Sequence, residues 1–386
     1  MLDAITQAKS RHHAARVAIV SCGAVAQRYY APALRELASH GVLQVTALYD
    51  PDAQNVERLK QSFPDAQCVG DLAELCPSWV DLAVIASPPR YHTQQTIALL
   101  RAGMSILCEK PMATSVLEAA SMIDAAAAAR GVLAIGLFRR FFPATQTIHQ
   151  IVSLGLLGDV MAFSFTEGSP FRWPVQSPSY FKRATANGGV LMDIGVHVLD
   201  LLVWWFGEPE AIRYEDDAMG GIEANCRLLC HFDGGMVGQI RLSRDCQLSN
   251  RYLIRGTRGW LSWDANDAEH LQMGFTGGDL GLNATLHALD PAHAAPVLGP
   301  RAHTFQQSFM AQICNVVGAM HGSEALVVPG EQGIRSLRLI EECYRQRSLM
   351  PLPWLSASEY GRAAQLNRAY EPDRDAPLGQ EDRNGR

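Results

Sequence analysis

The stretch VAIVSCGAVAQRYYAPAL, residues 17–34, joins an apolar run to a helical pattern through a short turn. The apolar run predicts a buried strand, and the spacing after the turn predicts an amphipathic helix. The turn is SCGAVA, whereas a dinucleotide-binding loop has the pattern G-x-G-x-x-G or G-x-G-x-x-A. Gly23 and Ala26 occupy its second and third positions, and Ser21 stands at the first. The stretch predicts either a nucleotide loop with a serine in its tight turn or an ordinary strand–turn–helix.

A second nucleotide-binding feature ends the next apolar run, LQVTALYD, at Asp50. An acidic side chain there accepts hydrogen bonds from the adenosine ribose and repels a 2′-phosphate. No arginine follows directly, so the pattern favours NAD, with NADP as the alternative. The competing interpretation is that Asp50 caps the next helix, because D-P-D is good capping sequence. The predicted nucleotide contacts so far are Ser21, Gly23, Ala24, Val25, Ala26 and Asp50.

The first part of the chain alternates short apolar runs with helical patterns up to residue 139. Helices are predicted over residues 24–39, 52–61, 91–102 and 115–129. Runs that are apolar throughout are typical of a parallel sheet covered on both faces, and right-handed crossovers make it doubly wound. The sequence therefore predicts an α/β protein with a Rossmann domain over residues 15–139, after a flexible N-terminus at residues 1–14.

The pattern changes after residue 140. Alternating apolar and polar residues predict several strands from residue 210 onward, which would form one large antiparallel sheet with one face packed on helices. Helices are expected over residues 144–156, 189–206, 303–320 and 329–347. These elements predict a second domain over residues 140–356. The charged extension at residues 357–386 is expected to be partly disordered.

Composition excludes several classes of protein. The net charge of −6 and the absence of a basic cluster argue against nucleic-acid binding. The most apolar stretch, residues 188–207, carries three ionisable side chains and is a poor membrane span. The nine cysteines are irregularly spaced and no signal peptide is expected, which favours reduced thiols in the cytoplasm. Cys226 and Cys230 lack a second ligand pair at zinc spacing, so no metal site is predicted.

Lys110 is the first candidate for catalysis. The fifth apolar run continues into ILCEKPM, which puts Glu109 and Lys110 at the carboxyl edge of the parallel sheet, where doubly wound folds bind ligands. A lysine there can donate a hydrogen bond to a substrate hydroxyl and stabilise the developing alkoxide. The competing interpretation is a surface ion pair.

The predicted helix over residues 189–206 is apolar nearly all round and should be buried. Its ionisable side chains are Asp193, His197 and Asp200, which share one helical face. His197 is then a candidate general base for a hydroxyl proton. Asp193 would orient the substrate or the imidazole, and Asp200 would support these residues without contacting the substrate. The competing interpretation is a buried structural network of these acids with the histidine.

Together these motifs resemble the Gfo/Idh/MocA oxidoreductases, a family that includes glucose–fructose oxidoreductase and inositol 2-dehydrogenase. The resemblance rests on the nucleotide loop, the EKP of residues 109–111 and the GGVLMDIGVH of residues 188–197, in that order. The segment ASPPRYH, residues 86–92, is also similar to the family's segment after the fourth strand. The resemblance covers residues 16–355, and Ser21 departs from the family's usual glycine.

The resemblance implies a Rossmann domain followed by a domain built on a large, open, mainly antiparallel sheet. It also implies a nicotinamide cofactor and a sugar or polyol substrate. Carried over by motif, Lys110 contacts the reacting hydroxyl, Asp193 helps to hold the substrate, and His197 takes or gives the proton. Further cofactor contacts implied are Ser87, Pro88, His92, Glu109 and Lys110.

The predicted reaction is reversible oxidation of a secondary alcohol with NAD, and an exposed sheet face suggests a homo-oligomer. Aromatic and cationic side chains near the domain junction suit a sugar ring, a carboxylate or a phosphate. The candidates for substrate binding are Arg139, Arg140, Trp173, Tyr180 and Lys182. Two alternatives remain open, namely an NAD-dependent glycosidase of the same family and a non-catalytic, nucleotide-binding regulatory protein.

Overall fold

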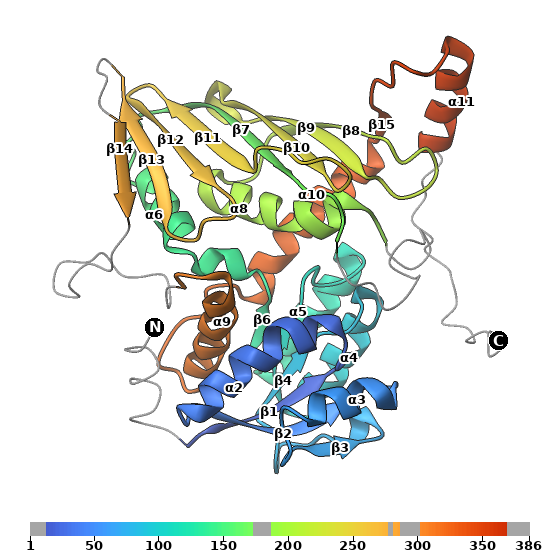
Figure 1. Ribbon diagram of the computed structural model, residues 1–386, viewed down its shortest axis with the longest axis vertical. Helices are drawn as coiled ribbons and strands as arrows, with labels where there is room; N and C mark the ends of the chain where they lie inside the picture. The colour runs from blue at the N-terminus through green and yellow to red at the C-terminus, as the bar shows by residue number, and fades with distance from the viewer. Residues whose placement is uncertain (1–12, 173–186, 277–280, 286–301, 369–386) are drawn as a thin grey trace.

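The computed structural model describes residues 13–172, 187–276, 281–285 and 302–368. These residues form two β-sheets, one toward each end of the molecule, with helices packed against both (Figure 1). In the part of the chain that the structure describes, no helix is long and apolar enough to cross a membrane.

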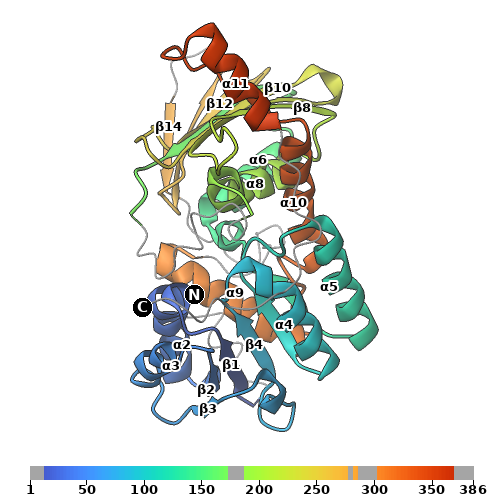
Figure 2. The ribbon, with the colours of Figure 1, turned by 90° about the vertical axis from the view of Figure 1, so that its right-hand side faces the viewer.

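The N-terminal sheet has six strands in the order β3-β2-β1-β4-β5-β6, and every neighbouring pair is parallel. This is the strand order of a Rossmann domain, so the predicted doubly wound fold is confirmed. Helices α2 and α3 lie on one side of the sheet, and α4 and α5 lie on the other (Figure 2). The strands are β1 Ala15–Val20, β2 Leu43–Tyr49, β3 Gln67–Val69, β4 Leu82–Ile85, β5 Ser105–Cys108 and β6 Leu133–Ile135.

Side-chain caps set where the N-terminal helices begin. The Asp52 carboxylate accepts a hydrogen bond from the backbone N–H of Gln54 and caps α3, and the Ser115 hydroxyl accepts one from the N–H of Glu118 and caps α5. The helix predicted over residues 24–39 is present, but its first part is a π-helix. The helices are η1 Ala26–Tyr30, α2 Ala31–Ser39, α3 Ala53–Lys60, α4 Pro89–Arg101 and α5 Val116–Ala129.

The C-terminal sheet has nine strands in the order β14-β13-β12-β11-β7-β10-β9-β8-β15. The pairs β7–β10 and β8–β15 are parallel and the other pairs are antiparallel, which confirms a mainly antiparallel sheet. Its strands are β7 Val160–Gly168, β8 Ala211–Asp216, β9 Asn225–His231, β10 Val237–Ser243, β11 Arg251–Gly256, β12 Gly259–Asp264, β13 His270–Phe275, β14 Gly281–Thr285 and β15 Ser348–Leu349.

One face of this sheet is packed on helices, as Figure 2 shows. The alternation of buried and exposed residues along β9 and β10 matches a sheet with one covered and one exposed face. The covering helices are α6 Pro143–Ser153, η5 Leu191–Gly195, α8 Val196–Phe206 and α10 Gly330–Arg345. Cys226 and Cys230 are both buried on the covered face of β9. Among the residues described, no group of three or more His, Cys, Asp or Glu could hold a metal ion.

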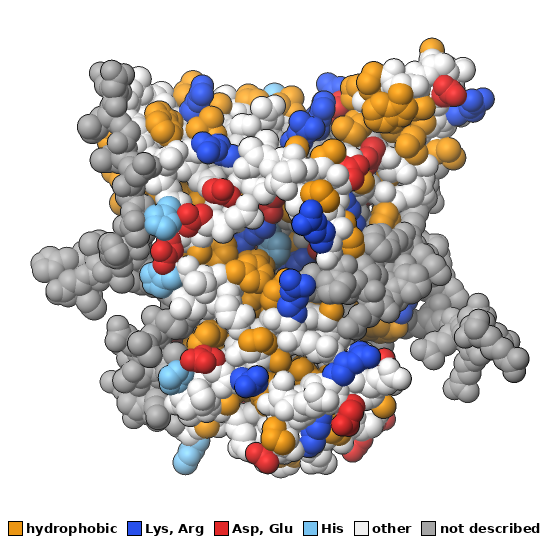
Figure 3. Space-filling model, in the orientation of Figure 1, with side chains coloured by type: hydrophobic (Ala, Val, Ile, Leu, Met, Phe, Trp, Pro, Cys, Tyr) orange, Lys and Arg blue, Asp and Glu red, His pale blue; other side chains and the backbone are white. Residues whose placement is uncertain are grey.

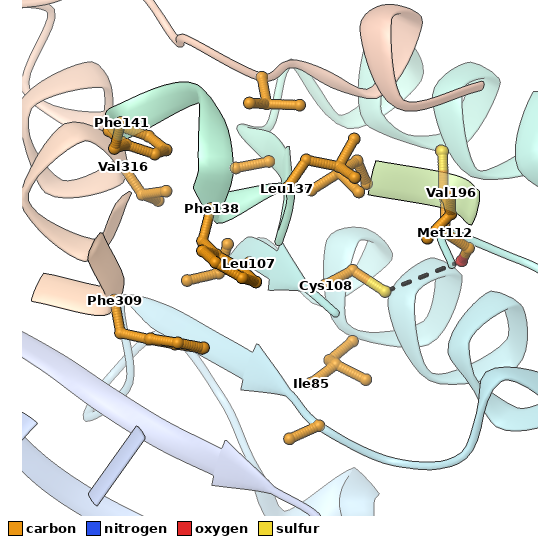
Figure 4. Close-up of a cluster of buried hydrophobic side chains, with 14 of the residues drawn as sticks. Ile85, Leu107, Cys108, Met112, Leu137, Phe138, Phe141, Val196, Phe309 and Val316 are labelled. Atoms are coloured by element: carbon orange, nitrogen blue, oxygen red, sulfur yellow. Dashed lines mark hydrogen bonds between the residues drawn. The ribbon is translucent and has the colours of Figure 1, made fainter. Parts of the chain in front are cut away.

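The linear division at residue 140 does not hold for helix α9, Phe305–Met320, which packs against α2 of the Rossmann domain (Figure 1). Phe309 of α9 is 2% exposed and stacks on Tyr29, with ring centroids 5.1 Å apart. It also lies beside Phe138 at the junction of the two domains (Figure 4). Residues 308–318 of α9 are all buried in this position, so the helix is covered on every side there.

The predicted C-terminal extension is helical in its first part. Helix α11, Ala357–Arg368, packs beside β15, where Leu349, Leu352 and Ala363 form a small buried cluster. The rest of the predicted extension, residues 369–386, and most of the predicted flexible N-terminus, residues 1–12, lie outside the described residues.

Candidate active site

A cleft of about 1420 Å³ lies at the carboxyl edge of the parallel sheet, between the two domains. Its lining includes the turns after β1, β2, β4 and β5 on one side and helices η5, α8 and α9 on the other. Figure 3 shows the molecular surface hollowed near the middle of one face. Doubly wound sheets bind ligands at this edge, so the cleft is the candidate active site.

The loop after β1 has a tight turn at position 21, of the kind that favours glycine. Ser21 has a φ of 74°, in the left-handed region. Its hydroxyl lies 3.2 Å from Asp50 Oδ2, and the backbone N–H of Cys22 donates to the same oxygen at 2.7 Å. Ala26 is fully buried and does not line the cleft, so the prediction that it contacts the nucleotide is wrong; the residue packs between helix and strand. The loop residues that line the cleft are Ser21, Gly23, Ala24 and Val25.

Asp50 lines the cleft and holds this loop, so the interpretation that it caps the next helix is wrong. The cap of α3 is Asp52, whose own N–H donates to Asp50 Oδ1 at 2.8 Å. The carboxylate of Asp50 therefore connects the ends of β1 and β2. Asn55 and Arg58 of α3 line the same end of the cleft.

Glu109 and Lys110 both line the cleft. The Glu109 side chain is nearly buried and accepts hydrogen bonds from the Tyr30 hydroxyl at 2.7 Å and the Lys110 N–H at 3.0 Å. Burial raises the pKa of the Glu109 carboxyl, although the Lys110 charge opposes the shift. Lys110 Nζ donates to Asp193 Oδ1 at 2.9 Å and to the Asp193 carbonyl at 3.0 Å. Lys110 is thus in an ion pair, as the competing interpretation expected, but the pair lies in the cleft and is partly buried.

His197 lines the cleft from helix α8 and is 5% exposed. Its ring meets Phe138 edge-on, with centroids 4.8 Å apart. Burial, with the Lys110 and Arg139 charges, holds the pKa of His197 well below its usual range. Nδ1 has no hydrogen-bond partner among the described residues. Burial therefore keeps the imidazole of His197 in its neutral form.

Asp200 does not form the structural network with His197 that the sequence left open. Its carboxylate accepts two hydrogen bonds from Arg140, at 2.9 Å from Nε and 2.6 Å from a terminal nitrogen. Both side chains are 2% exposed, and Arg140 also lies over the Trp204 ring. The expectation that Arg140 binds substrate is corrected, because its guanidinium is buried in this pair and does not line the cleft.

Some of the other predicted contacts line the cleft and some do not. Arg139 lines the cleft and pairs through both terminal nitrogens with Glu167, at 2.6 and 2.8 Å. Ser87 and Pro88 line the cleft. His92 is fully buried and does not, because its ring nitrogens lie 2.7 Å from the Ser87 carbonyl and 2.9 Å from the Pro111 carbonyl. His92 therefore joins two cleft loops rather than contacting a cofactor. Trp173, Tyr180 and Lys182 lie outside the described residues.

Sequence reasoning missed two groups that line the cleft. Arg244, directly after β10, donates to Asp193 Oδ2 at 3.0 Å. Four aromatic rings form one wall, with neighbouring centroids about 5 Å apart, and come from three elements. They are Tyr29, Phe138, Phe305 and Phe309. No local pattern marks these residues, since a strand end and three helices bring them together.

Comparisons with known proteins agree with this geometry. Residues 15–137 match the model of an oxidoreductase family with an NAD-binding Rossmann fold, and residues 145–262 match the GFO/IDH/MocA C-terminal domain. The rhizopine catabolism protein MocA of Rhizobium meliloti is 30% identical over 237 residues, 59% of this chain and 71% of that protein. Trans-1,2-dihydrobenzene-1,2-diol dehydrogenase of Mus musculus is 30% identical over 258 residues, 64% of this chain and 73% of that protein.

Among solved structures, levoglucosan dehydrogenase in complex with NADH and levoglucosan has a TM-score of 0.72. It is 20% identical, and the match covers 86% of this chain and 98% of that one, so the two share a fold. Both domain models match in chain order, and a relative of 30% identity matches over most of its own length. The chain therefore belongs to the Gfo/Idh/MocA family of NAD-binding oxidoreductases.

Proposed function

We propose that this protein transfers a hydride between NAD and a secondary hydroxyl of a sugar, a sugar derivative or a cyclic polyol. The observation that carries the proposal is the meeting of Lys110, Asp193 and His197 in one cleft beside the nucleotide loop. The two dehydrogenases compared above act, by their names, on a cyclic diol and on an anhydrosugar. Both substrates offer a secondary alcohol on a ring.

The residues present fit a nicotinamide dinucleotide. The loop around Gly23 exposes its backbone to the cleft, and Asp50 lines the cleft directly beside this loop. Ser21, Gly23 and the adjoining residues would hold the pyrophosphate, Asp50 the adenosine ribose and Glu109 the nicotinamide ribose. When bound, the nicotinamide supplies the acceptor for the hydride that leaves the carbinol carbon.

The side chains in the cleft would move the proton and hold the oxygen. The Lys110 ammonium would donate a hydrogen bond to the substrate hydroxyl oxygen and stabilise the charge that develops on it. His197, neutral because its pKa is held low, would take the hydroxyl proton on a ring nitrogen. Asp193 would orient both Lys110 and the substrate. The alcohol would thereby lose a hydride and a proton and become a ketone.

The first experiment is a fluorescence titration of the purified protein with NADH and NADPH. We expect micromolar binding of NADH and weaker binding of NADPH, because the Asp50 carboxylate repels a 2′-phosphate. Equal or tighter binding of NADPH would reverse the cofactor assignment. If neither nucleotide binds, the proposal is overturned. The non-catalytic alternative fails as well, because it also requires nucleotide binding.

The second experiment follows NADH formation with a panel of sugars, glycosides and inositols. Lys110→Ala is expected to lower turnover by about 100- to 1000-fold while NADH binding stays close to that of the parent. Lys60→Ala, in α3 and away from the cleft lining, is the matched control. A near-normal rate for Lys110→Ala would remove Lys110 from the mechanism. Release of an aglycone without net NADH would instead identify the glycosidase alternative.

We further propose that the protein acts in the cytoplasm as a homo-oligomer. All nine cysteines are free thiols, including the exposed Cys68 and Cys246. Free, exposed thiols fit a reducing compartment. Leu229 and Val237 are exposed on the uncovered face of the nine-stranded sheet, which supports a second copy packing there. Sedimentation velocity tests the assembly, and a monomer at micromolar concentration would contradict it.

A further inference from the structure

Arg244 stands in an unusual position for an arginine. It follows the last residue of β10 and is 8% exposed, yet it lines the cleft. Its backbone is held on both sides, because its N–H donates to the Ala224 carbonyl at 2.9 Å and its carbonyl accepts from the Phe171 N–H at 2.7 Å. Its guanidinium lies over the Phe171 ring, 5.3 Å from the centroid. A nearly buried arginine requires an anionic partner.

That partner is Asp193. One terminal nitrogen of Arg244 donates to Asp193 Oδ2 at 3.0 Å, while Lys110 Nζ donates to Oδ1 at 2.9 Å. The two cations therefore hold the two oxygens of one carboxylate. Lys110 follows β5 and Arg244 follows β10, and these two strands lie in different sheets. Arg139, another cation of the cleft, is paired through two nitrogens with Glu167 instead.

We propose that Arg244 is a positioning residue for the reaction, which fixes Asp193 and thereby aims the Lys110 ammonium at the substrate hydroxyl. The inference rests on the proposed function. By themselves, Lys110 and Asp193 would form a neutral pair, and the carboxylate would draw the ammonium charge away from the substrate. With Arg244 sharing the carboxylate, Lys110 keeps more of its positive charge available for an alkoxide.

The fixed geometry has a second consequence. A carboxylate held by one flexible lysine alone can rotate, whereas a second hydrogen bond from a buried guanidinium removes that freedom. Because misplacement of a catalytic group by about 1 Å can lower a rate by about 100-fold, Arg244 would affect kcat without touching the substrate. A residue that bound a substrate anion would instead affect KM.

The test compares Arg244→Met and Arg244→Lys in the full-length protein. We expect Arg244→Met to lower kcat by about 100-fold, with little change in KM or in NADH affinity, and Arg244→Lys to recover part of that loss. Arg241→Met is the matched control, because Arg241 lies on the same strand with its side chain exposed on the uncovered face. A kcat within about two-fold of the parent for Arg244→Met would overturn the proposal. So would a loss confined to KM.

A second measurement does not depend on turnover. Acetic anhydride labelling, followed by peptide mass spectrometry, measures how readily Lys110 loses its proton, with Lys60 as the internal reference. In the described part of the chain, the titratable groups that interact with Lys110 include Asp193, Glu109, Tyr29 and His197. In Arg244→Met, the Asp193 carboxylate would lose the Arg244 charge and hold the Lys110 proton more tightly, so labelling of Lys110 should slow.

The labelling result separates three outcomes. Slower labelling with a lowered kcat supports the proposal. Faster labelling would mean that Lys110 has lost Asp193 and that Arg244 only holds the fold, which overturns it. If the parent oxidises no alcohol, the proposed function fails, and slower labelling would still assign the Lys110–Asp193–Arg244 arrangement.

Discussion

At Ser21, the backbone adopts a conformation that disfavours a side chain. A non-glycine residue in the left-handed region costs roughly 1 kcal/mol. The hydroxyl of Ser21, 3.2 Å from Asp50 Oδ2, offsets part of that cost, and the Cys22 N–H on the same oxygen keeps the carboxylate in place. The serine therefore departs from the usual glycine without breaking the turn.

The first prediction compares two substitutions at this position. Ser21→Ala keeps the strain and loses the hydrogen bond, whereas Ser21→Gly loses both. We expect Ser21→Ala to be less stable than Ser21→Gly by about 1 kcal/mol in urea unfolding. We expect Ser21→Gly to bind NADH at least as well as the parent. Equal stability of the two variants would show that the turn relaxes when the side chain changes.

The second prediction concerns pH. Because the pKa of His197 is held well below its usual range, the imidazole stays neutral as pH falls through 6.5 and becomes protonated only at lower pH. A base is active when neutral, so kcat/KM should not fall near pH 6.5 and should decline only in more acidic solution. The pH profile of the parent measures this, and His197→Gln, with a low rate at every pH, is the control. An acidic limb centred at 6.5 or above would contradict the assignment.

At the scale of elements, the loop that precedes β9 holds the helix that carries Asp193 and His197. Glu223 is fully buried and accepts hydrogen bonds from the N–H groups of Gly189 and Leu191, at 2.9 and 3.1 Å. Its carbonyl accepts another from Val190 at 3.0 Å. A Cβ on Gly189 would lie 1.9 Å from that carbonyl oxygen, which explains the glycine at this position.

The third prediction therefore compares two Gly→Ala changes. Gly189→Ala must displace the backbone of Glu223, so we expect a loss of more than about 3 kcal/mol in unfolding free energy, or failure to fold. Gly361→Ala, in the exposed middle of α11 where a Cβ would meet nothing within 4 Å, should raise stability by about 0.5–1 kcal/mol. A mild effect at Gly189 would mean that the loop before β9 moves independently of the helix.

At the scale of the whole molecule, the two domains share one core. Helix α9 packs on α2, and α10 packs on both α5 and α8, so late parts of the chain cover early ones. The buried apolar residues of both sheets form one continuous cluster. The Arg140–Asp200 pair adds a buried ionic contact beside the junction. Neither domain can therefore lose its packing without exposing apolar surface of the other.

The fourth prediction is a single cooperative unfolding transition. Trp79 lies in the Rossmann domain, and the other tryptophans of the described residues lie after residue 200, so Trp79→Phe separates the two fluorescence signals. Both signals and calorimetry should give one midpoint, and NADH should raise it as a whole. Two midpoints, with only one shifted by NADH, would show that the domains unfold separately.

Local sequence was sufficient for much of this architecture. Continuous apolar runs predicted the strands of the parallel sheet, and the helical pattern over residues 115–129 predicted α5 to within a residue of where it begins and ends. Alternation predicted the strands of the second sheet. The same local logic failed for Arg140, whose charge suggested a ligand contact, because charge alone does not distinguish a substrate anion from a buried Asp200 that lies 60 residues away.

By itself, then, the sequence determined the fold class, the order of the strands along the chain and the ionisable stripe of the helix with Asp193 and His197. Period and local hydrogen bonding encode these features within a few residues. Only the tertiary structure decided which charges meet. It paired Lys110 with Asp193 and brought Arg244 from another sheet, and it returned α9 to the first domain. Those contacts join residues far apart in the chain. They form only when the two sheets and their helices pack and bury their apolar surfaces against one another.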